Sequence, residues 1–234
     1  MADSSNPCRR IFLALSWSAL AAILGLQVEP ALSQVLEGGS AGTRPEAAQK
    51  LGGGPIRPPQ FHEMAQGQSP NSLFITCSDS RLIPSLITRS GIGEVFVIRN
   101  AGNIVPPYDL RPEGVTATIE YAVAVLEVPK IIVCGHTQCG AMKAALDPTG
   151  LDTVPNVANW IKFVEPARLA VDELHPSLGP EARWLELVKQ NVRQQLTNLK
   201  THPWVAARTA TGRLRLEGWV YWLENRRVVH LSLP

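Results

Sequence analysis

Short runs of apolar residues, separated by polar segments, mark the middle of the chain. Three of these runs have the length and composition of buried strands: Ser72–Cys77, Glu94–Arg99 and Lys130–Cys134. Between the second and third runs, apolar residues recur at helical spacing over Glu113–Leu126. A strand, a helix and a further strand in this order predict a parallel crossover unit.

The second half of the chain continues with helical and strand patterns. The spacing predicts helices over Val157–Leu174 and Glu181–Lys200, and a shorter one over Pro203–Thr211. Two final strands are predicted over Leu214–Tyr221 and Val228–Leu231. The fold class that follows is α/β, with a central, mainly parallel β-sheet flanked by helices. In such sheets, ligands bind beyond the carboxyl ends of the strands.

The first 33 residues have the pattern of an export signal. Arg9 and Arg10 precede the apolar run Ile11–Leu26, and a small-residue pattern ends at Ser33. The run has 16 residues and spans about 24 Å as a helix, less than the roughly 30 Å of a hydrocarbon core. We therefore expect a signal peptide over residues 1–33, an exported and periplasmic protein, and no stable membrane association after its removal. A permanent membrane anchor is the alternative.

Two adjacent arginines also suggest a particular export route. Arg9 to Leu13 resembles the twin-arginine pattern R-R-x-F-L, although Cys8 stands where Ser or Thr is usual. A chance pair of arginines in a basic signal region is the alternative.

Composition narrows the class of the remaining chain. The 234 residues are 45% apolar and 18% charged, as in ordinary globular proteins, which excludes a mostly disordered chain. The 22 basic and 20 acidic residues are too balanced for a nucleic-acid surface, and four cysteines are too few for a disulfide scaffold. Residues 34–60 are rich in glycine and proline and predict a flexible linker, so we expect the folded domain over residues 61–234.

Three metal-ligand side chains follow two of the predicted strands. Cys77 ends the first, while His136 and Cys139 follow the third in the spacing H-x-x-C. Parallel strands end at the same edge of a sheet, so these side chains are expected to meet there. Two thiolates and one imidazole form a known catalytic zinc set with an open fourth position. A redox pair of Cys77 with Cys139 is the alternative, and Cys134, in mid-strand, is interpreted as an inert buried thiol.

A carboxylate and a guanidinium lie just past the first predicted strand. Asp79 and Arg81 could form an ordinary surface ion pair, which contributes little. Beside a metal, Arg81 would keep Asp79 ionised and oriented. Asp79 could then bind the metal or accept a hydrogen bond from a group bound to it.

Four stretches carry a family resemblance: CSDSR at residues 77–81, RNAGN at 99–103, EYAV at 120–123 and GHTQCGA at 135–141. Together they resemble the β-class carbonic anhydrases, from about Phe61 to about Leu231. The resemblance implies the fold of that family, a homodimer or higher homo-oligomer, and the zinc-dependent, reversible hydration of carbon dioxide to bicarbonate and a proton. It also implies a role in carbon utilisation.

The resemblance also implies roles for individual residues. Zinc would be held by the Cys2His group, with Asp79 either as a fourth ligand in a resting form or, paired with Arg81, as the partner of zinc-bound water. Gln68 matches a glutamine that hydrogen-bonds bicarbonate. Phe96 and Tyr121 match pocket-wall positions that are often supplied across a dimer interface.

Two departures from the family pattern bear on assembly and regulation. Glycine and proline over residues 34–60 replace amphipathic N-terminal helices that wrap the partner subunit. Phe74 stands where members with a non-catalytic bicarbonate site carry Trp, which disfavours an allosteric bicarbonate switch.

Two other functions are compatible with the same residues. One is a related hydrolase of carbon disulfide or carbonyl sulfide, which would differ in the shape of its pocket. The other is a non-catalytic, zinc-stabilised scaffold. The Asp79–Arg81 pair disfavours the scaffold, because a structural zinc ion needs no open position.

Overall fold

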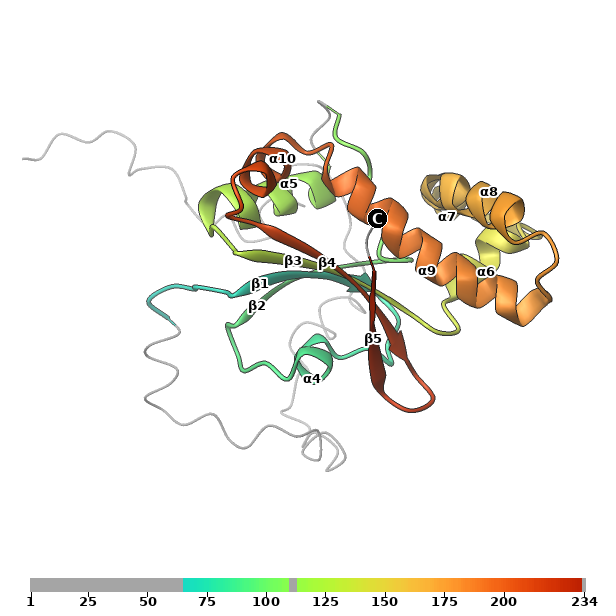
Figure 1. The fold of residues 1–234 in the computed structure, drawn as a ribbon, viewed down its shortest axis with the longest axis horizontal. Coiled ribbons are helices and arrows are strands. Elements are labelled where there is room, and N and C mark those ends of the chain that lie inside the picture. The colour runs from blue at the N-terminus through green and yellow to red at the C-terminus, as the bar shows by residue number, and fades with distance from the viewer. Residues whose placement is uncertain (1–64, 110–112, 233–234) are drawn as a thin grey trace, which may run out of the picture. The chain divides into compact units, whose positions relative to one another are not determined.

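The computed structural model describes residues 65–109 and 113–232. Within these residues, five strands form one sheet in the order β2-β1-β3-β4-β5 (Figure 1). Their bounds are β1 Ser72–Cys77, β2 Val95–Asn100, β3 Lys130–His136, β4 Arg215–Trp222 and β5 Arg227–Leu231. β1 to β4 are parallel, and β5 runs antiparallel to β4. The predicted α/β fold with a mainly parallel sheet is therefore confirmed.

Helices lie on both faces of this sheet. Their bounds are α4 Pro84–Thr88, α5 Gly114–Glu120, α6 Gly140–Leu146, α7 Pro155–Ile161, α8 Glu165–Leu174, α9 Pro180–Leu199 and α10 Pro203–Ala210. A π-helical turn over Tyr121–Val125 follows α5. α5, α9 and α10 cover one face, and α4 lies on the other (Figure 1).

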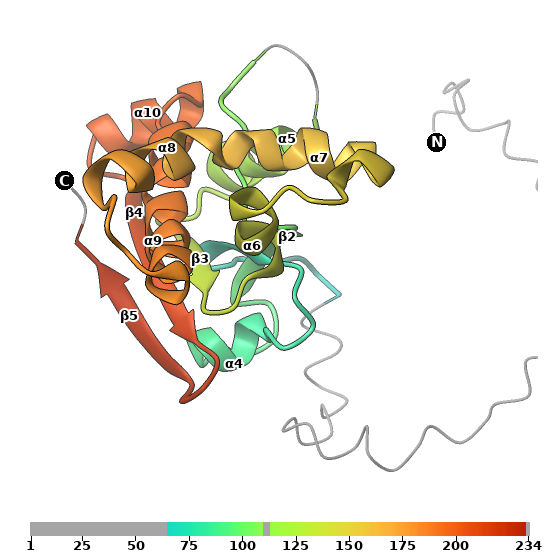
Figure 2. The same ribbon diagram turned by 90° about the vertical axis from the view of Figure 1, so that its right-hand side faces the viewer.

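One predicted helix is divided in two. The pattern over Val157–Leu174 predicts a single helix, but a 3-10 turn over Lys162–Val164 separates α7 from α8. Pro166 explains the break, because its ring clashes with the carbonyl group four residues earlier and it has no N–H to donate. α7 and α8 follow one another along nearly the same line (Figure 2).

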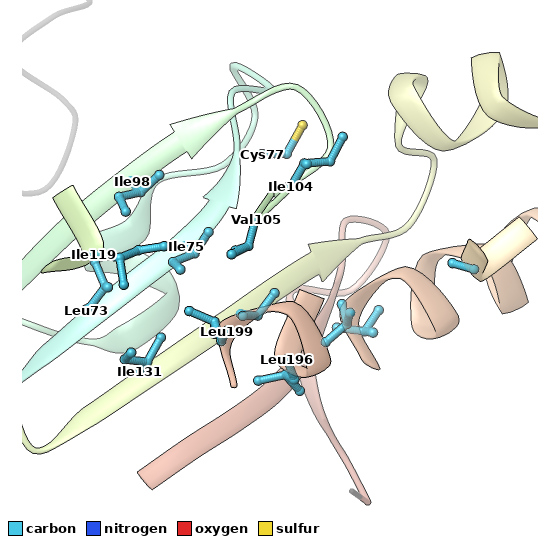
Figure 3. Close-up of a cluster of buried hydrophobic side chains, with 14 of the residues drawn as sticks. Leu73, Ile75, Cys77, Ile98, Ile104, Val105, Ile119, Ile131, Leu196 and Leu199 are labelled. Atoms are coloured by element: carbon cyan, nitrogen blue, oxygen red, sulfur yellow. The ribbon is translucent and has the colours of Figure 1, made fainter. Parts of the chain in front are cut away.

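The core lies on both sides of β1, which is buried along its whole length. Leu73 and Ile75 pack with Ile119 of α5 and Leu199 of α9 (Figure 3). Phe74 points to the opposite face, where its ring lies edge-on to Trp219, with the centroids 6.1 Å apart. Strands buried on both faces have continuous apolar sequences, which is the pattern that made β1 and β3 predictable.

A glycine allows β3 to lie close to α9. A Cβ atom on Gly135 would lie 2.9 Å from Val192 Cγ2 and 3.1 Å from Val188 Cγ1. The close approach fixes the end of β3 against the helix at the residue before His136.

Neither the predicted signal peptide, residues 1–33, nor the predicted linker, residues 34–60, lies within the described residues. Across 65–109 and 113–232, we find no helix with the length and apolar character needed to span a bilayer.

Candidate metal centre

Two strand ends and one helix start bring three ligand side chains together. Cys77 is the last residue of β1, His136 is the last residue of β3, and Cys139 precedes the first turn of α6. Their ligand atoms all lie within 4.8 Å of one another, and all three residues are buried. The convergence expected from parallel strands is thus present at the carboxyl edge of the sheet.

The imidazole of His136 has one nitrogen available for a metal. Its Nδ1 lies 2.8 Å from the carbonyl oxygen of Thr137, a geometry that assigns the proton to Nδ1 as the donor. Its Nε2 is buried and has no hydrogen-bond partner among the described residues. A buried nitrogen without a partner is costly, and metal coordination would satisfy it.

The two thiols are unequal in acidity. A hydrogen bond from Cys139 lowers the pKa of the Cys77 thiol well below its ordinary value, and backbone N–H groups contribute to the shift. The same hydrogen bond, together with burial, raises the pKa of Cys139 well above its ordinary value. The second thiolate therefore forms with difficulty beside the first. A divalent cation removes this conflict, since a coordinating thiol loses its proton. Two sulfurs and one imidazole nitrogen fit zinc.

The thiolate of Cys77 is also supported from the neighbouring loop. The backbone N–H of Gly102 donates a hydrogen bond to Cys77 Sγ at 3.4 Å. The carbonyl of Gly102 accepts a 3.0 Å bond from Asn191 Nδ2 of α9, and Gln195 Nε2 donates in turn to Asn191 Oδ1 at 2.8 Å. Buried polar side chains of α9 thus hold the loop that contacts the centre.

Asp79 and Arg81 form a two-pronged ion pair beside the ligands. Arg81 Nε donates to Asp79 Oδ1 at 2.9 Å, and Arg81 Nη2 donates to Asp79 Oδ2 at 2.7 Å. Asp79 Oδ2 lies 3.9 Å from His136 Nε2. The hydrogen bonds from Arg81 hold the pKa of Asp79 well below its usual range. In the structure, both oxygens of the Asp79 carboxylate are therefore engaged by Arg81.

Arg99 is a positioning residue that the sequence analysis did not single out. Its Nη2 donates to the carbonyl of Asp79 at 2.7 Å, and its Nε donates to the carbonyl of Cys77 at 3.2 Å. Its place in the RNAGN motif was the available signal. Glu224 contacts the two residues between His136 and Cys139, Thr137 and Gln138, and no motif marked it.

Phe96, one of the three expected pocket residues, lies apart from the metal ligands of its own chain. In the register of the sheet, Phe96 lies beside Leu73, whereas Cys77 lies beside Asn100. Phe96 is therefore four residues, or about 13 Å along the strand direction, from the level of Cys77. The rings of Phe96 and Tyr121 lie 6.0 Å apart, and Tyr121 is 44% exposed. Gln68 is exposed in the segment before β1. The structure brings Phe96 and Tyr121 together but does not bring Phe96 to the metal ligands of the same chain.

The chemistry of the centre defines a class of protein. A structural zinc ion is closed by a fourth protein ligand, whereas three ligands beside an oriented carboxylate are typical of metal-dependent enzymes. The parallel sheet places this group where α/β enzymes bind their substrates.

Comparisons with known proteins give the family. A family model described as carbonic anhydrase matches residues 72–228. The chain is 51% identical over 174 residues to a carbonic anhydrase of Pseudomonas aeruginosa, covering 74% of this chain and 79% of that protein. It is 47% identical over 171 residues to carbonic anhydrase 1 of Escherichia coli O157:H7, covering 73% and 78%.

Solved structures agree with these matches. The β-carbonic anhydrase CcaA superposes with a TM-score of 0.71 at 37% identity, covering 91% of this chain and 95% of that one. The Coccomyxa β-carbonic anhydrase, solved with acetazolamide, gives a TM-score of 0.67 at 35% identity, covering 73% and 76%. The chain belongs to the β-carbonic anhydrase family. It is an enzyme that hydrates carbon dioxide reversibly to bicarbonate and a proton. The matches favour this activity over hydrolysis of carbon disulfide or carbonyl sulfide and over a non-catalytic scaffold.

Proposed function

We propose that Cys77, His136 and Cys139 hold one zinc ion per chain as the cofactor of carbon dioxide hydration. The observation that carries this proposal is the buried, unpartnered Nε2 of His136 within one group with two thiols. When bound, zinc lowers the pKa of water from about 15.7 toward about 7 and so supplies a nucleophile near neutral pH. With three protein ligands, a fourth position stays open for reaction.

Asp79 and Arg81 form the proposed catalytic pair. Asp79 presents a carboxylate oxygen 3.9 Å from His136 Nε2, beside the three side chains that would hold zinc. It is an ionised acceptor, because the hydrogen bonds of Arg81 lower its pKa. There it would accept a hydrogen bond from water and so orient that water for attack on carbon dioxide. Arg81 keeps the carboxylate in this place.

Metal analysis and rapid kinetics test the zinc proposal. The purified protein should contain about one zinc per chain, and stopped-flow hydration of carbon dioxide should stop after chelation and return after zinc is added. Cys139→Ala should lose most of its zinc, because two remaining ligands hold the ion weakly. Full zinc occupancy in this variant would reject the ligand assignment.

We also propose that Gln68, Phe96 and Tyr121 complete the substrate pocket of a partner subunit in a homodimer or larger homo-oligomer. The support is their position: they lie in exposed or half-buried places, and Phe96 lies about four residues along β2 from the level of Cys77. One of the similar structures belongs to a pair of β-carbonic anhydrases of Sordaria macrospora that are described as tetrameric.

Mixing two inactive variants tests this sharing. In a mixed dimer of Asp79→Asn with Tyr121→Ala, one site receives Asp79 from one chain and Tyr121 from the other. Refolding or co-expressing the two variants should therefore restore part of the activity. If both residues acted within one chain, both sites of the mixed dimer would stay defective and no activity would return.

The sequence pattern over residues 1–33 supports a further proposal, that the protein is exported to the periplasm by the twin-arginine route. This route carries folded proteins, so the thiols would be metallated before they meet an oxidising compartment. Changing Arg9 and Arg10 to Lys keeps the signal charge but should prevent periplasmic accumulation. Unchanged export of the double variant would favour the general secretory route. A membrane-bound protein that keeps its first residues would favour the anchor.

A further inference from the structure

The two-residue turn between His136 and Cys139 has a conformation that needs external support. Gln138 adopts a positive φ of 56°, a region that residues other than glycine rarely occupy. Such conformations persist where the surroundings hold them, and they concentrate at functional sites. The groups that hold this turn therefore set the relative directions of His136 and Cys139.

Thr137 attaches the turn to the end of β4. Its N–H donates to the carbonyl of Tyr221 at 3.0 Å, and its hydroxyl oxygen accepts a 3.0 Å bond from the N–H of Leu223. The same hydroxyl donates to Glu224 Oε2 at 2.9 Å. Because the carbonyl of Thr137 is the partner of His136 Nδ1, this attachment also fixes the imidazole ring.

Glu224 holds the second residue of the turn with its other oxygen. Gln138 Nε2 donates to Glu224 Oε1 at 3.0 Å. The carbonyl of Gln138 lies 3.4 Å from Arg81 Nη2, the atom that also contacts Asp79. The Glu224 carboxylate, in the β4–β5 turn, thus contacts both residues that separate the ligands His136 and Cys139. The series of hydrogen bonds continues from Gln138 through Arg81 to Asp79.

We propose that Glu224 is a positioning residue that clamps the turn Thr137–Gln138, and so holds His136 and Cys139 in the geometry that retains zinc. The inference rests on the zinc site proposed above. Glu224 is separated from Thr137 and Gln138 by 87 and 86 residues, so only the closure of the sheet brings them together.

Positioning explains the contacts of Glu224 better than proton transfer does. Both of its carboxylate oxygens are engaged by the turn, so the group is fixed in one place. Hydrogen bonds from its own backbone N–H and from Thr137 lower its pKa, which makes it a weak proton acceptor at neutral pH.

The test compares three variants of the zinc-loaded, full-length protein. Glu224→Ala removes both acceptors. Glu224→Gln keeps an oxygen for Thr137, and its amide N–H can donate to Gln138 once the Gln138 amide turns over, so the clamp is preserved without the charge. Glu217→Ala is the matched control. Glu217 lies on β4, where it accepts a hydrogen bond from Trp219 Nε1 at 3.1 Å and lies 4.0 Å from Lys130 Nζ. Neither of these contacts involves the turn Thr137–Gln138.

The readout is the rate of zinc release to a colorimetric chelator at a temperature well below unfolding. We expect Glu224→Ala to release zinc about tenfold faster than the parent, the scale on which partners of ligand residues act. Glu224→Gln and Glu217→Ala should release zinc at a rate close to that of the parent. In stopped-flow assays, Glu224→Ala should lower kcat with little change in KM.

Three results would overturn the clamp: a parental release rate in Glu224→Ala, an equal acceleration in Glu217→Ala, or an equal acceleration in Glu224→Gln. The last result would indicate that the charge matters rather than the positioning. Failure of the zinc site itself is distinguishable, because the parent would then lack stoichiometric zinc before any variant is compared.

Discussion

Replacing Asp79 with Asn separates catalysis from stability at the proposed catalytic pair. In the parent structure, Arg81 Nε and the backbone N–H of Arg81 donate to Asp79 Oδ1 at 2.9 Å and 3.0 Å. The amide oxygen of Asn can still accept both of these hydrogen bonds. The amide nitrogen cannot accept from Nη2, and the charge is lost. Because the side chain of Arg81 is 50% exposed, the pair contributes only about 0.2–1 kcal/mol to the free energy of unfolding. Loss of a positioned polar group at a reacting centre costs more, about 100- to 1000-fold in kcat.

The assay measures three quantities on the same preparation: zinc per chain, the melting temperature and the stopped-flow rate of carbon dioxide hydration. We expect zinc to stay near one per chain and the melting temperature to fall by no more than about 2–4 °C. The hydration rate should fall by at least about 100-fold. Arg81→Lys, which cannot make the two-pronged contact, should lie between the parent and Asp79→Asn. A hydration rate in Asp79→Asn equal to that of the parent would refute the reasoning. A loss of zinc in proportion to the loss of hydration rate would also refute it, because Asp79 would then be a metal ligand.

Two further predictions concern stability. Gly135→Ala should lower the free energy of unfolding by about 1–3 kcal/mol, because the new Cβ would lie 2.9 Å from Val192 Cγ2; an unchanged denaturation midpoint would contradict this. Burial lowers the pKa of His202 below 6.5, so the unfolded state binds protons more readily and stability should fall as pH drops below 6.5. His202→Gln should flatten this dependence in thermal melts, and an equally steep dependence in the variant would assign it to other groups.

The convergence of the metal ligands was predictable because it follows from strand direction. β1 and β3 are buried on both faces, so their sequences are continuous apolar runs that periodicity detects. Once both are known to be parallel, the residues that end them must lie at one edge. The prediction of Cys77 beside His136 therefore needed no knowledge of distances.

Features that depend on closure of the whole sheet were not predictable. The contact of Glu224 with Thr137 joins residues 87 positions apart, and an exposed glutamate in a turn has no distinguishing local pattern. The division of the predicted helix over 157–174 depended on Pro166, which a periodic pattern of apolar residues does not register. The short helix α4 has only five residues and none of them is buried, so it is too short to show the periodic apolar pattern by which helices are recognised.

The charges around the centre explain why the carboxylate of Asp79 must be held by a partner. Two thiolates neutralise the charge of a divalent ion, so a third anion is not needed to balance the site. A free Asp79 carboxylate, within 3.9 Å of His136 Nε2, would nevertheless compete with water for the open position. In the proposed site, Arg81 would prevent this, because it engages both oxygens of the carboxylate and makes the pair neutral as a unit. We therefore infer that this ion pair, which contributes little to folding, keeps the fourth position of the proposed zinc site available for substrate.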